Sequence, residues 1–214
     1  MSKIQLYNED NMGLMARYED NYFDLAIVDP PYGGNDAIGL KDNKKQGKQA
    51  AKRTNYNVFE NIAPNEDYFK ELKRVSKEQI IWGVNFYSNF DLSGGRIVWD
   101  KKGTAFGRAE LAYYSKSKSV NIVELVWNGM LQHDMKNKEV RIHPTQKPVK
   151  LYEWLLTNYA NTGDKILDTH LGSGSIALAC HNLGYNLTAC ELDEEYFKAA
   201  SKRLKEHQQQ LVMF

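Results

Sequence analysis

The stretch FDLAIVDPPY, residues 23–32, holds the most informative change of pattern in the chain. Its apolar run ends at Val28, and an acid, two prolines and an aromatic residue follow. A continuous apolar run of this length is typical of a parallel strand that is buried on both faces. Open α/β sheets bind ligands at the carboxyl ends of such strands. The pattern therefore predicts a buried strand that delivers Asp29 and Tyr32 to a binding edge.

Strand and helix patterns alternate along most of the 214 residues. Helices are predicted over 11–20, 65–75, 148–160, 175–183 and 193–207. Strands are predicted over 3–8, 23–29, 79–84, 96–99, 110–115, 121–127, 164–168 and 186–191, with 110–115 and 121–127 as candidates for a hairpin. Such alternation is typical of a mostly parallel, twisted sheet with helices on both faces, so we expect one α/β domain over residues 1–214.

The composition is ordinary for a globular protein and excludes little. Charged residues make up 26% of the chain, and the formal net charge is +1. No apolar run approaches the length of a membrane span, and the first ten residues lack the apolar core of a signal peptide. Cys180 and Cys190 fit neither a disulfide framework nor a metal site. We therefore expect a cytoplasmic protein without a membrane or a metal partner.

One stretch is strongly basic. Residues 41–53, KDNKKQGKQAAKR, carry six basic side chains and one acid. A charge run of this kind is usually a solvated loop. Its place directly after DPPY favours a second interpretation, in which it contacts nucleic-acid phosphates. The side chains that would make these contacts are Lys44, Lys45, Lys48, Lys52 and Arg53.

A second ligand-binding pattern is ILDTHLGSGS, residues 166–175. Gly172 and Gly174 allow a tight turn between a strand and a helix, with close approach of the backbone to a ligand. Glu191 closes the next strand, where an acid can accept hydrogen bonds from two ribose hydroxyls. The turn lacks the third glycine of the dinucleotide fingerprint, and the chain has no Walker phosphate loop. A nucleoside without phosphates therefore fits better than a dinucleotide or a nucleotide.

The DPPY residues are suited to activating an amino group on a base. The Asp29 carboxylate, with carbonyls whose direction the prolines fix, can accept hydrogen bonds from both amine protons and localise the nitrogen lone pair. Tyr32 offers a flat face for a base to stack on. An amine held in this way can attack an activated methyl group in line, without a metal. Two prolines alone would more simply indicate a turn, but an acid-Pro-Pro-aromatic sequence after a buried strand favours the chemical interpretation.

Three motifs together resemble a known family. DPPY at 29–32, HPTQKP at 143–148 and LGSGS at 171–175, in this order, are similar to motifs of S-adenosylmethionine-dependent amino-methyltransferases that act on DNA. The order, with the catalytic motif before the cofactor motif, resembles the group usually called β. This resemblance implies a Rossmann-like domain with permuted motif order, S-adenosylmethionine as the cofactor and double-stranded DNA as the partner. It also implies a bacterial or phage-encoded protein, with or without a companion restriction nuclease.

The resemblance implies roles for individual residues. Those implied to hold the flipped target base are Asp29, Pro30, Pro31 and Tyr32. Those implied to bind the cofactor are Asp168, Leu171, Gly172, Ser173, Gly174, Ser175, Glu191, His143, Thr145 and Lys147. The ammonium of Lys147 is suited to pair with the carboxylate of the cofactor. His143 could instead be a residue that opens the following helix and has no ligand.

The cofactor turn departs from the family at one point. The family usually has Asp-Pro-Phe where this chain has Asp168-Thr169-His170. The missing phenylalanine removes an apolar contact near the cofactor, so we expect weaker cofactor binding. The same departure supports an alternative, a non-catalytic nucleic-acid-binding relative, whereas the retained glycines favour an active enzyme.

The resemblance favours adenine in DNA as the target. Aspartate in the first position of the tetrapeptide is typical of adenine-specific relatives, serine of cytosine-specific ones and asparagine of those that methylate amides. Methylation of the cytosine amino group, of RNA or of a protein amide stays open. The candidate target-recognition segments are 33–60 and 128–142. Relatives in this group often form dimers, and no patch in the sequence decides between a monomer and a homodimer.

Overall fold

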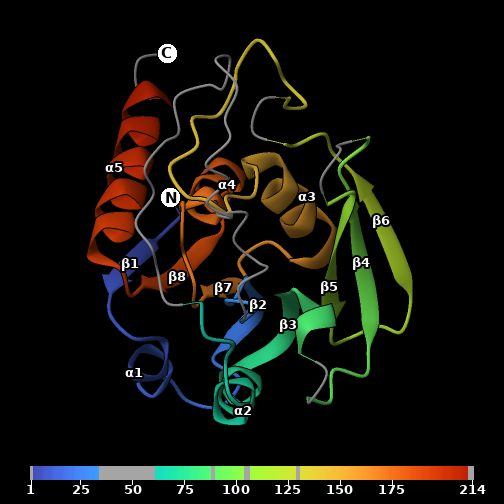
Figure 1. The fold of residues 1–214 in the computed structure, drawn as a ribbon. Helices are drawn as coiled ribbons and strands as arrows, with labels where there is room; N and C mark the ends of the chain where they lie inside the picture. The colour runs from blue at the N-terminus through green and yellow to red at the C-terminus, as the bar shows by residue number, and fades with distance from the viewer. Residues whose placement is uncertain (1, 34–60, 88–89, 104–106, 129–130, 212–214) are drawn as a thin grey trace, which may run out of the picture.

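An eight-stranded sheet organises the protein (Figure 1). The computed structural model describes residues 2–33, 61–87, 90–103, 107–128 and 131–211. Its strands are β1 (Ile4–Asn8), β2 (Phe23–Val28), β3 (Ser76–Trp82), β4 (Gly95–Asp100), β5 (Ala109–Tyr114), β6 (Val120–Glu124), β7 (Lys165–Asp168) and β8 (Asn186–Glu191). Its helices are α1 (Asn11–Met15), α2 (Glu66–Val75), the 3₁₀ turn η1 (Val84–Phe86), α3 (Val149–Tyr159), α4 (Ser175–Leu183) and α5 (Glu194–Leu211).

The order of the strands brings distant parts of the chain together. The sheet runs β1-β8-β7-β2-β3-β5-β4-β6, and its first five strands are parallel. Strand β5 is antiparallel to both of its neighbours, and β6 is parallel to β4. The mostly parallel α/β architecture predicted from the sequence is confirmed. Because β2 pairs directly with β7, the residues after these two strands emerge side by side at one edge.

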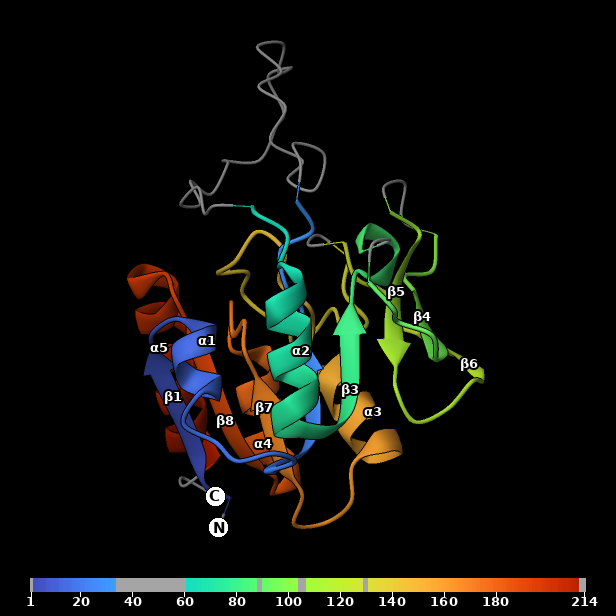
Figure 2. The ribbon, with the colours of Figure 1, turned by 90° about the horizontal axis from the view of Figure 1, so that it is seen from below.

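Two helical layers cover the sheet, as both faces of a parallel sheet require. Helices α3, α4 and α5 lie on one face, and α1 and α2 lie on the other (Figure 2). Leu151 and Leu155 of α3 are completely buried against the first face, and Leu72 of α2 is completely buried against the second. The central strand β2 contributes to both layers: Ile27 packs with the first and Val28 with the second. No helix in the described parts of the chain is long and apolar enough to cross a membrane.

The predicted hairpin between residues 110–115 and 121–127 is wrong. Strand β5 lies between β3 and β4, whereas β6 pairs only with β4 at the edge of the sheet. Alternation of apolar residues predicts that a segment is a strand, but it does not predict which strand it pairs with. The edge position explains the exposure of Val120 and Ile122 on β6.

Helix α1 is shorter than the predicted helix over 11–20. The Asp10 carboxylate caps it by accepting hydrogen bonds from the backbone of Met12 and Gly13. The helix ends after Met15, and Gly13 in its middle lowers its intrinsic helix propensity. This short helix leaves Asn11 and Met12 at the carboxyl end of β1, close to the ends of β8 and β7.

Helix α2 matches its prediction and positions a tyrosine for the binding edge. Its N-cap is Asn65, whose side-chain oxygen accepts a 3.0 Å hydrogen bond from the backbone nitrogen of Tyr68. Acidic residues in its first turn and basic residues in its last turn complement the helix dipole. The hydroxyl of Tyr68 lies 2.7 Å from Oγ1 of Thr169, so the helix packs directly against the cofactor turn.

We expect the Asn65→Ala variant to be less stable by about 1 kcal/mol, because the first turn of α2 loses its capping acceptor. Chemical denaturation followed by circular dichroism measures this loss. The Asn65→Asp variant keeps an acceptor at the same position and should remain close to wild type. Equal stability of Asn65→Ala and wild type would contradict the capping role.

Candidate active site

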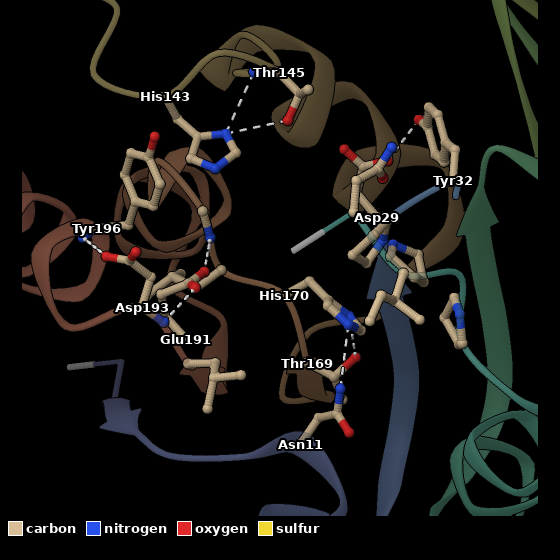
Figure 3. A pocket seen from close by; sticks show the side chains of 18 of the residues that line it. Asn11, Asp29, Tyr32, His143, Thr145, Thr169, His170, Glu191, Asp193 and Tyr196 are labelled. Atoms are coloured by element: carbon tan, nitrogen blue, oxygen red, sulfur yellow. Dashed lines mark hydrogen bonds between the residues drawn. The ribbon is translucent and has the colours of Figure 1, made fainter. Parts of the chain in front are cut away.

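A cavity of about 620 Å³ opens at the carboxyl ends of the central strands. Its volume falls within the roughly 300–1,000 Å³ that small-molecule sites usually have. Residues of DPPY line one part of it, and the glycine turn with Glu191 lines another. Figure 3 shows Asp29 and Tyr32 on one side of the cavity, Glu191 and Asp193 on the other, and His170 between them. The two motifs predicted separately from the sequence therefore share one site.

Most of the predicted site residues line this cavity. These are Asp29, Pro30, Pro31, Tyr32, His143, Thr145, Lys147, Leu171, Gly172, Ser173 and Glu191. The cavity is not lined by Asp168, Gly174 or Ser175. Asp168 orients the turn, because its Oδ1 accepts a 2.9 Å hydrogen bond from the backbone nitrogen of His170. Burial raises the pKa of this carboxyl to about 8. The direct cofactor contacts expected of these three residues stay predictions.

The glycine turn is hydrogen-bonded to the acid that ends β8. Gly172, with a φ of +51°, donates its backbone N–H to Oε2 of Glu191 at 2.8 Å. The other carboxylate oxygen accepts a 3.0 Å hydrogen bond from the backbone of Asp193. Both oxygens are thereby oriented, and each keeps a lone pair for a further donor. Burial raises the pKa of the Glu191 carboxyl, although the backbone donors oppose that rise.

The acceptors of DPPY are held from behind by other side chains. The hydroxyl of Tyr32 donates to Oδ1 of Asp29 at 2.7 Å, and the ammonium of Lys147 contacts Oδ2. The hydroxyl of Tyr87 donates to the carbonyl of Pro30 at 2.8 Å and lies 3.1 Å from that of Pro31. Each oxygen can accept a second hydrogen bond. These contacts therefore fix the direction of the acceptor oxygens and still leave them able to bind an amine. Tyr87, which follows η1, ends the segment IIWGVNFY (80–87), which resembles a minor motif of the family but carries no implied role for this tyrosine.

Lys147 is buried and lies among acidic and aromatic groups. Besides Asp29, its Nζ lies 3.1 Å from Oε2 of Glu110 and 3.3 Å from the hydroxyl of Tyr32. Burial by itself would lower the pKa of Lys147, but the two carboxylates outweigh burial and raise it. The ammonium is hydrogen-bonded to Asp29 and Tyr32 and forms an ion pair with Glu110, a partnership that sequence reasoning missed. Pairing with a cofactor carboxylate stays a prediction, and it would require one of these contacts to open.

The Tyr32 ring is fixed by residues that follow β3. It stacks on Phe86 with ring centroids 4.6 Å apart and an interplanar angle of 7°. Gly83, at a φ of +75°, lies against the same ring, and a Cβ atom there would come within 2.2 Å of its Cε1. A side chain at position 83 is therefore incompatible with the observed place of Tyr32. Gly83 and Phe86 both lie in the segment 80–87, which resembles a minor motif of the family, but the resemblance implies no role for either of them, and η1 is too short for a periodic pattern.

His170 belongs to a hydrogen-bonded chain at the floor of the cavity. Its Nε2 lies 3.2 Å from the side-chain amide nitrogen of Asn11, and its Nδ1 lies 2.9 Å from Oγ1 of Thr169. Burial lowers the pKa of His170 to about 4, so the ring is neutral near pH 7. Because the Asn11 amide is a donor, Nε2 accepts and Nδ1–H donates to Thr169. Asn11 could have been anticipated only from the pairing of β1 with β8, which the sequence does not contain.

His143 and Thr145 form a separate wall of the cavity. Nδ1 of His143 lies 3.1 Å from Oγ1 of Thr145, and the imidazole packs edge-on against Tyr196 at 4.4 Å. Burial, together with the charges of Lys147 and Arg141, lowers the pKa of His143 to about 4. A Cβ atom on Gly172 would lie 3.6 Å from this imidazole, so the HPTQKP segment approaches the cofactor turn closely.

Arg203 of α5 ties the candidate recognition segment 128–142 to the cofactor turn. Its guanidinium donates to the backbone oxygen of Ser173 at 3.0 Å and to Oε2 of Glu139 at 2.7 Å. The other oxygen of Glu139 accepts the backbone N–H of Val149 at the start of α3. Gln132, which is buried, exchanges hydrogen bonds with the backbone of Glu139. The described part of this segment is therefore anchored at its base.

Some predicted features fall outside the described residues. Lys44, Lys45, Lys48, Lys52, Arg53 and nearly all of segment 33–60 belong to this group. Their contacts with nucleic acid stay predictions. Within the described ranges, no cluster of three or more His, Cys, Asp or Glu side chains could hold a metal ion.

Comparisons with known proteins agree with this geometry. A family model of N6/N4 type with the description "DNA methylase" matches residues 98–202. The Type II methyltransferase M.HpaI of Haemophilus parainfluenzae is 38% identical, over 89% of this chain and 70% of that protein. The chain belongs to the N6/N4 DNA methylase family. Another similar DNA methylase is the Type II methyltransferase M2.DpnII of Streptococcus pneumoniae, which is 25% identical over 95% of this chain and 90% of that protein.

Solved structures of DNA methylases show the same fold. M1.HpyAVI in complex with SAM superposes with a TM-score of 0.59 at 22% identity, covering 94% of this chain and all of that one. The PvuII DNA methyltransferase, described as cytosine-N4-specific, has a TM-score of 0.59 at 14% identity and covers 97% of this chain and 92% of its own. These structures confirm the fold, while the family model and M.HpaI confirm the family identified from three short motifs.

We expect the Gly83→Ala variant to lose at least about a hundredfold in DNA methylation rate, because its Cβ displaces Tyr32 and small displacements in a reacting site are costly. A methyl-transfer assay measures the rate. Gly103 has the same φ of +75° but open space around its would-be Cβ, so Gly103→Ala is the matched control for backbone strain. Equal activities of the two variants would show that the fixed position of Tyr32 is unimportant.

We expect the His170→Phe variant to bind S-adenosylhomocysteine about fivefold more tightly, because an aromatic apolar contact is gained. The free energy of unfolding should fall by about 1–2 kcal/mol, since Asn11 and Thr169 lose hydrogen-bond partners. Calorimetric titration and chemical denaturation measure the two effects. His207→Phe, which changes a histidine that contacts Asn182 rather than the cavity, is the control. Affinity unchanged from wild type would contradict the expected role of position 170.

Proposed function

We propose that this DNA methylase transfers a methyl group from S-adenosylmethionine to the exocyclic amino nitrogen of adenine in double-stranded DNA. The observation that carries the proposal is the shared cavity of Asp29 and Glu191, which come from distant parts of the chain. One end offers a ribose-binding acid beside a glycine turn, and the other offers acceptors for an amine. A cavity with these two ends suits a nucleoside methyl donor facing a base.

The chemistry of the cavity fits the proposed cofactor. The lone pairs left on Glu191 suit the two ribose hydroxyls. Exposed apolar side chains of Met12, Ile62 and Leu192 line the same cavity and offer surface to a purine ring. Gly172 leaves the backbone open to the methionine portion, because no side chain extends from it. When bound, S-adenosylmethionine supplies an electrophilic methyl group.

The DPPY end fits an amino nitrogen. Asp29 and the carbonyl of Pro30 would accept the two N–H groups of the amine and turn its lone pair toward the methyl group. Their directions are fixed in advance by Tyr32, Lys147 and Tyr87, so little reorganisation is needed when the base arrives. A flipped base would contact the ring of Tyr32, and Phe86 adjoins that ring.

The choice of adenine rests on the resemblance of the tetrapeptide to adenine-specific relatives. A cytosine amine could use the same two acceptors, so the geometry alone serves both bases. Cytosine-N4 methylation is therefore the second candidate, and the described fold is shared with the PvuII enzyme.

The anchored segment 128–142 is our candidate for reading DNA. Its exposed side chains include Lys136 and Lys138, which suit phosphates, and Leu131, Met135 and Val140, which suit apolar edges of bases. The basic stretch 41–53 is the second candidate for phosphate contacts.

We expect DNA from cells that express the protein to contain N6-methyldeoxyadenosine after digestion to nucleosides, and DNA from cells that express Asp29→Ala to lack it. Removal of Asp29 should lower the rate at least about a hundredfold, because the amine loses a charged acceptor. Chromatography with mass spectrometry identifies the nucleoside. Detection of N4-methyldeoxycytidine instead would contradict the choice of adenine and support cytosine-N4 methylation. Cofactor binding without any methylated nucleoside would support the non-catalytic relative.

A further inference from the structure

A row of four alternating charges leads from the end of β4 to the catalytic motif. Lys101, after β4, pairs with Oε1 of Glu110 on β5. Oε2 of Glu110 lies 3.1 Å from Nζ of Lys147, and Lys147 in turn pairs with Asp29. The proposed chemistry uses Asp29, but it assigns no role to Glu110 or Lys101.

The second carboxylate on Lys147 is not required for charge balance. The side chain of Lys147 is 3% exposed and that of Asp29 is 16% exposed, so these two already form a neutral, largely buried pair. A further charge near such a pair costs desolvation unless it has its own partner. Glu110 has that partner in Lys101, whose ammonium also lies over the ring of Trp99. The arrangement thus places an additional, separately paired negative charge beside the Asp29–Lys147 pair, where it acts on Asp29 through their shared lysine.

The proposed methyl transfer leaves a proton to remove. The bond from sulfur to the methyl carbon breaks and leaves its electron pair on sulfur, while the amine nitrogen forms the new bond to carbon. The nitrogen then carries a positive charge and must release one proton. The carboxylate of Asp29, which would already accept one of its N–H groups, is the acceptor in place, and the proton passes later to water.

Lys147 alone would make Asp29 a poor proton acceptor, because an adjacent ammonium favours the ionised carboxylate. We propose, resting on the proposed function, that Glu110 is a positioning residue that shares the Lys147 ammonium and so keeps Asp29 basic enough to take this proton. Lys147 would orient Asp29 without neutralising its basicity, and Lys101 would hold Glu110 in place.

The electrostatic surroundings of Asp29 agree with this assignment. Burial raises the pKa of its carboxyl, Lys147 opposes the rise, and Glu110 adds to it. The Glu110 carboxyl is disfavoured as an anion by burial, but Lys147 and Lys101 outweigh this and hold its pKa at about 2. The other titratable groups that interact with Asp29 are Tyr32, Tyr68 of α2, Tyr87 after η1, Tyr152 of α3 and Asp168 of β7. None of the tyrosines ionises near neutral pH, since the pKa of each is raised.

The decisive variant is Glu110→Gln, measured in single-turnover methylation of DNA across pH. The rate should rise with pH as Asp29 loses its proton, and removal of the Glu110 charge lowers the pKa of Asp29. We therefore expect the acidic limb of the pH–rate profile, where the rate rises with pH, to move about one pH unit lower. The plateau rate should fall about fivefold, because a weaker base accepts the proton less readily. The KM values for DNA and cofactor should stay within about twofold of wild type.

Two further variants separate this role from a purely structural one. Lys101→Met keeps an apolar stem but leaves Glu110 to Lys147 alone, so the acidic limb should move in the opposite direction, to higher pH. Glu124→Gln removes a glutamate of β6 that pairs with Lys102, in the turn after β4, and should leave the limb unchanged. An acidic limb at the same pH in wild type and Glu110→Gln, whatever the loss of rate or stability, would overturn the proposal.

A measurement without DNA distinguishes failure of this inference from failure of the proposed function. Carbon-13 NMR of the side-chain carboxyls, with Asp29 assigned by Asp29→Asn, gives the titration midpoint of Asp29 directly. We expect a lower midpoint in Glu110→Gln than in wild type, and equal midpoints would overturn the role of Glu110. If wild type methylates no base, the proposed function fails, while the midpoints still decide whether Glu110 acts on Asp29.

Discussion

The buried ion pair between Asp29 and Lys147 is the contact on which the site depends. It joins two side chains separated by 118 positions in the sequence, one after β2 and one just before α3. Neither charge would be tolerable alone at this depth, because an unpaired buried charge is strongly destabilising. The pair therefore fixes the HPTQKP segment over the end of β2, and with it the His143 wall over the glycine turn. The acceptors of DPPY owe their direction to the same contact and to the hydroxyls of Tyr32 and Tyr87.

The order of the sheet makes this contact possible. Strand β2 lies between β3 and β7, so the tetrapeptide after β2 emerges between η1 on one side and the cofactor turn on the other. The residues after β3 contribute Gly83 and Phe86 to the surroundings of Tyr32, and β7 is followed by the turn that is hydrogen-bonded to Glu191 at the end of β8. The catalytic half precedes the cofactor half in the chain, yet the parallel arrangement places both at one edge. The order of the two motifs in the chain therefore does not prevent them from lining one cavity.

Much of the fold could be predicted from the sequence because burial leaves local patterns. Strand β2 is apolar on both faces, α2 carries its own cap and apolar face, and glycines mark the turn after β7. The pairing of strands leaves no such local pattern, which is why the sequence makes residues 110–115 and 121–127 candidates for a hairpin, whereas β5 and β6 each pair with β4. The same reason explains the site residues that were missed. Asn11, Tyr87 and Glu110 reach the cavity or its charged row only through the pairing of β1, β3 and β5 with strands distant in sequence.

Lys147 shows that the sequence also does not predict the partners of a single side chain. The sequence identified a lysine near the cofactor, but its partners in the structure are two carboxylates from other strands.

A crystal structure of the protein with bound S-adenosylhomocysteine tests the central contact most directly. We expect the ribose at Glu191, the sulfur facing the Asp29 side of the cavity, and the Lys147 ammonium still within about 3 Å of the Asp29 carboxylate, the usual distance of a charge-assisted hydrogen bond. A Lys147 side chain that leaves Asp29 to bind the carboxylate of the ligand would contradict it.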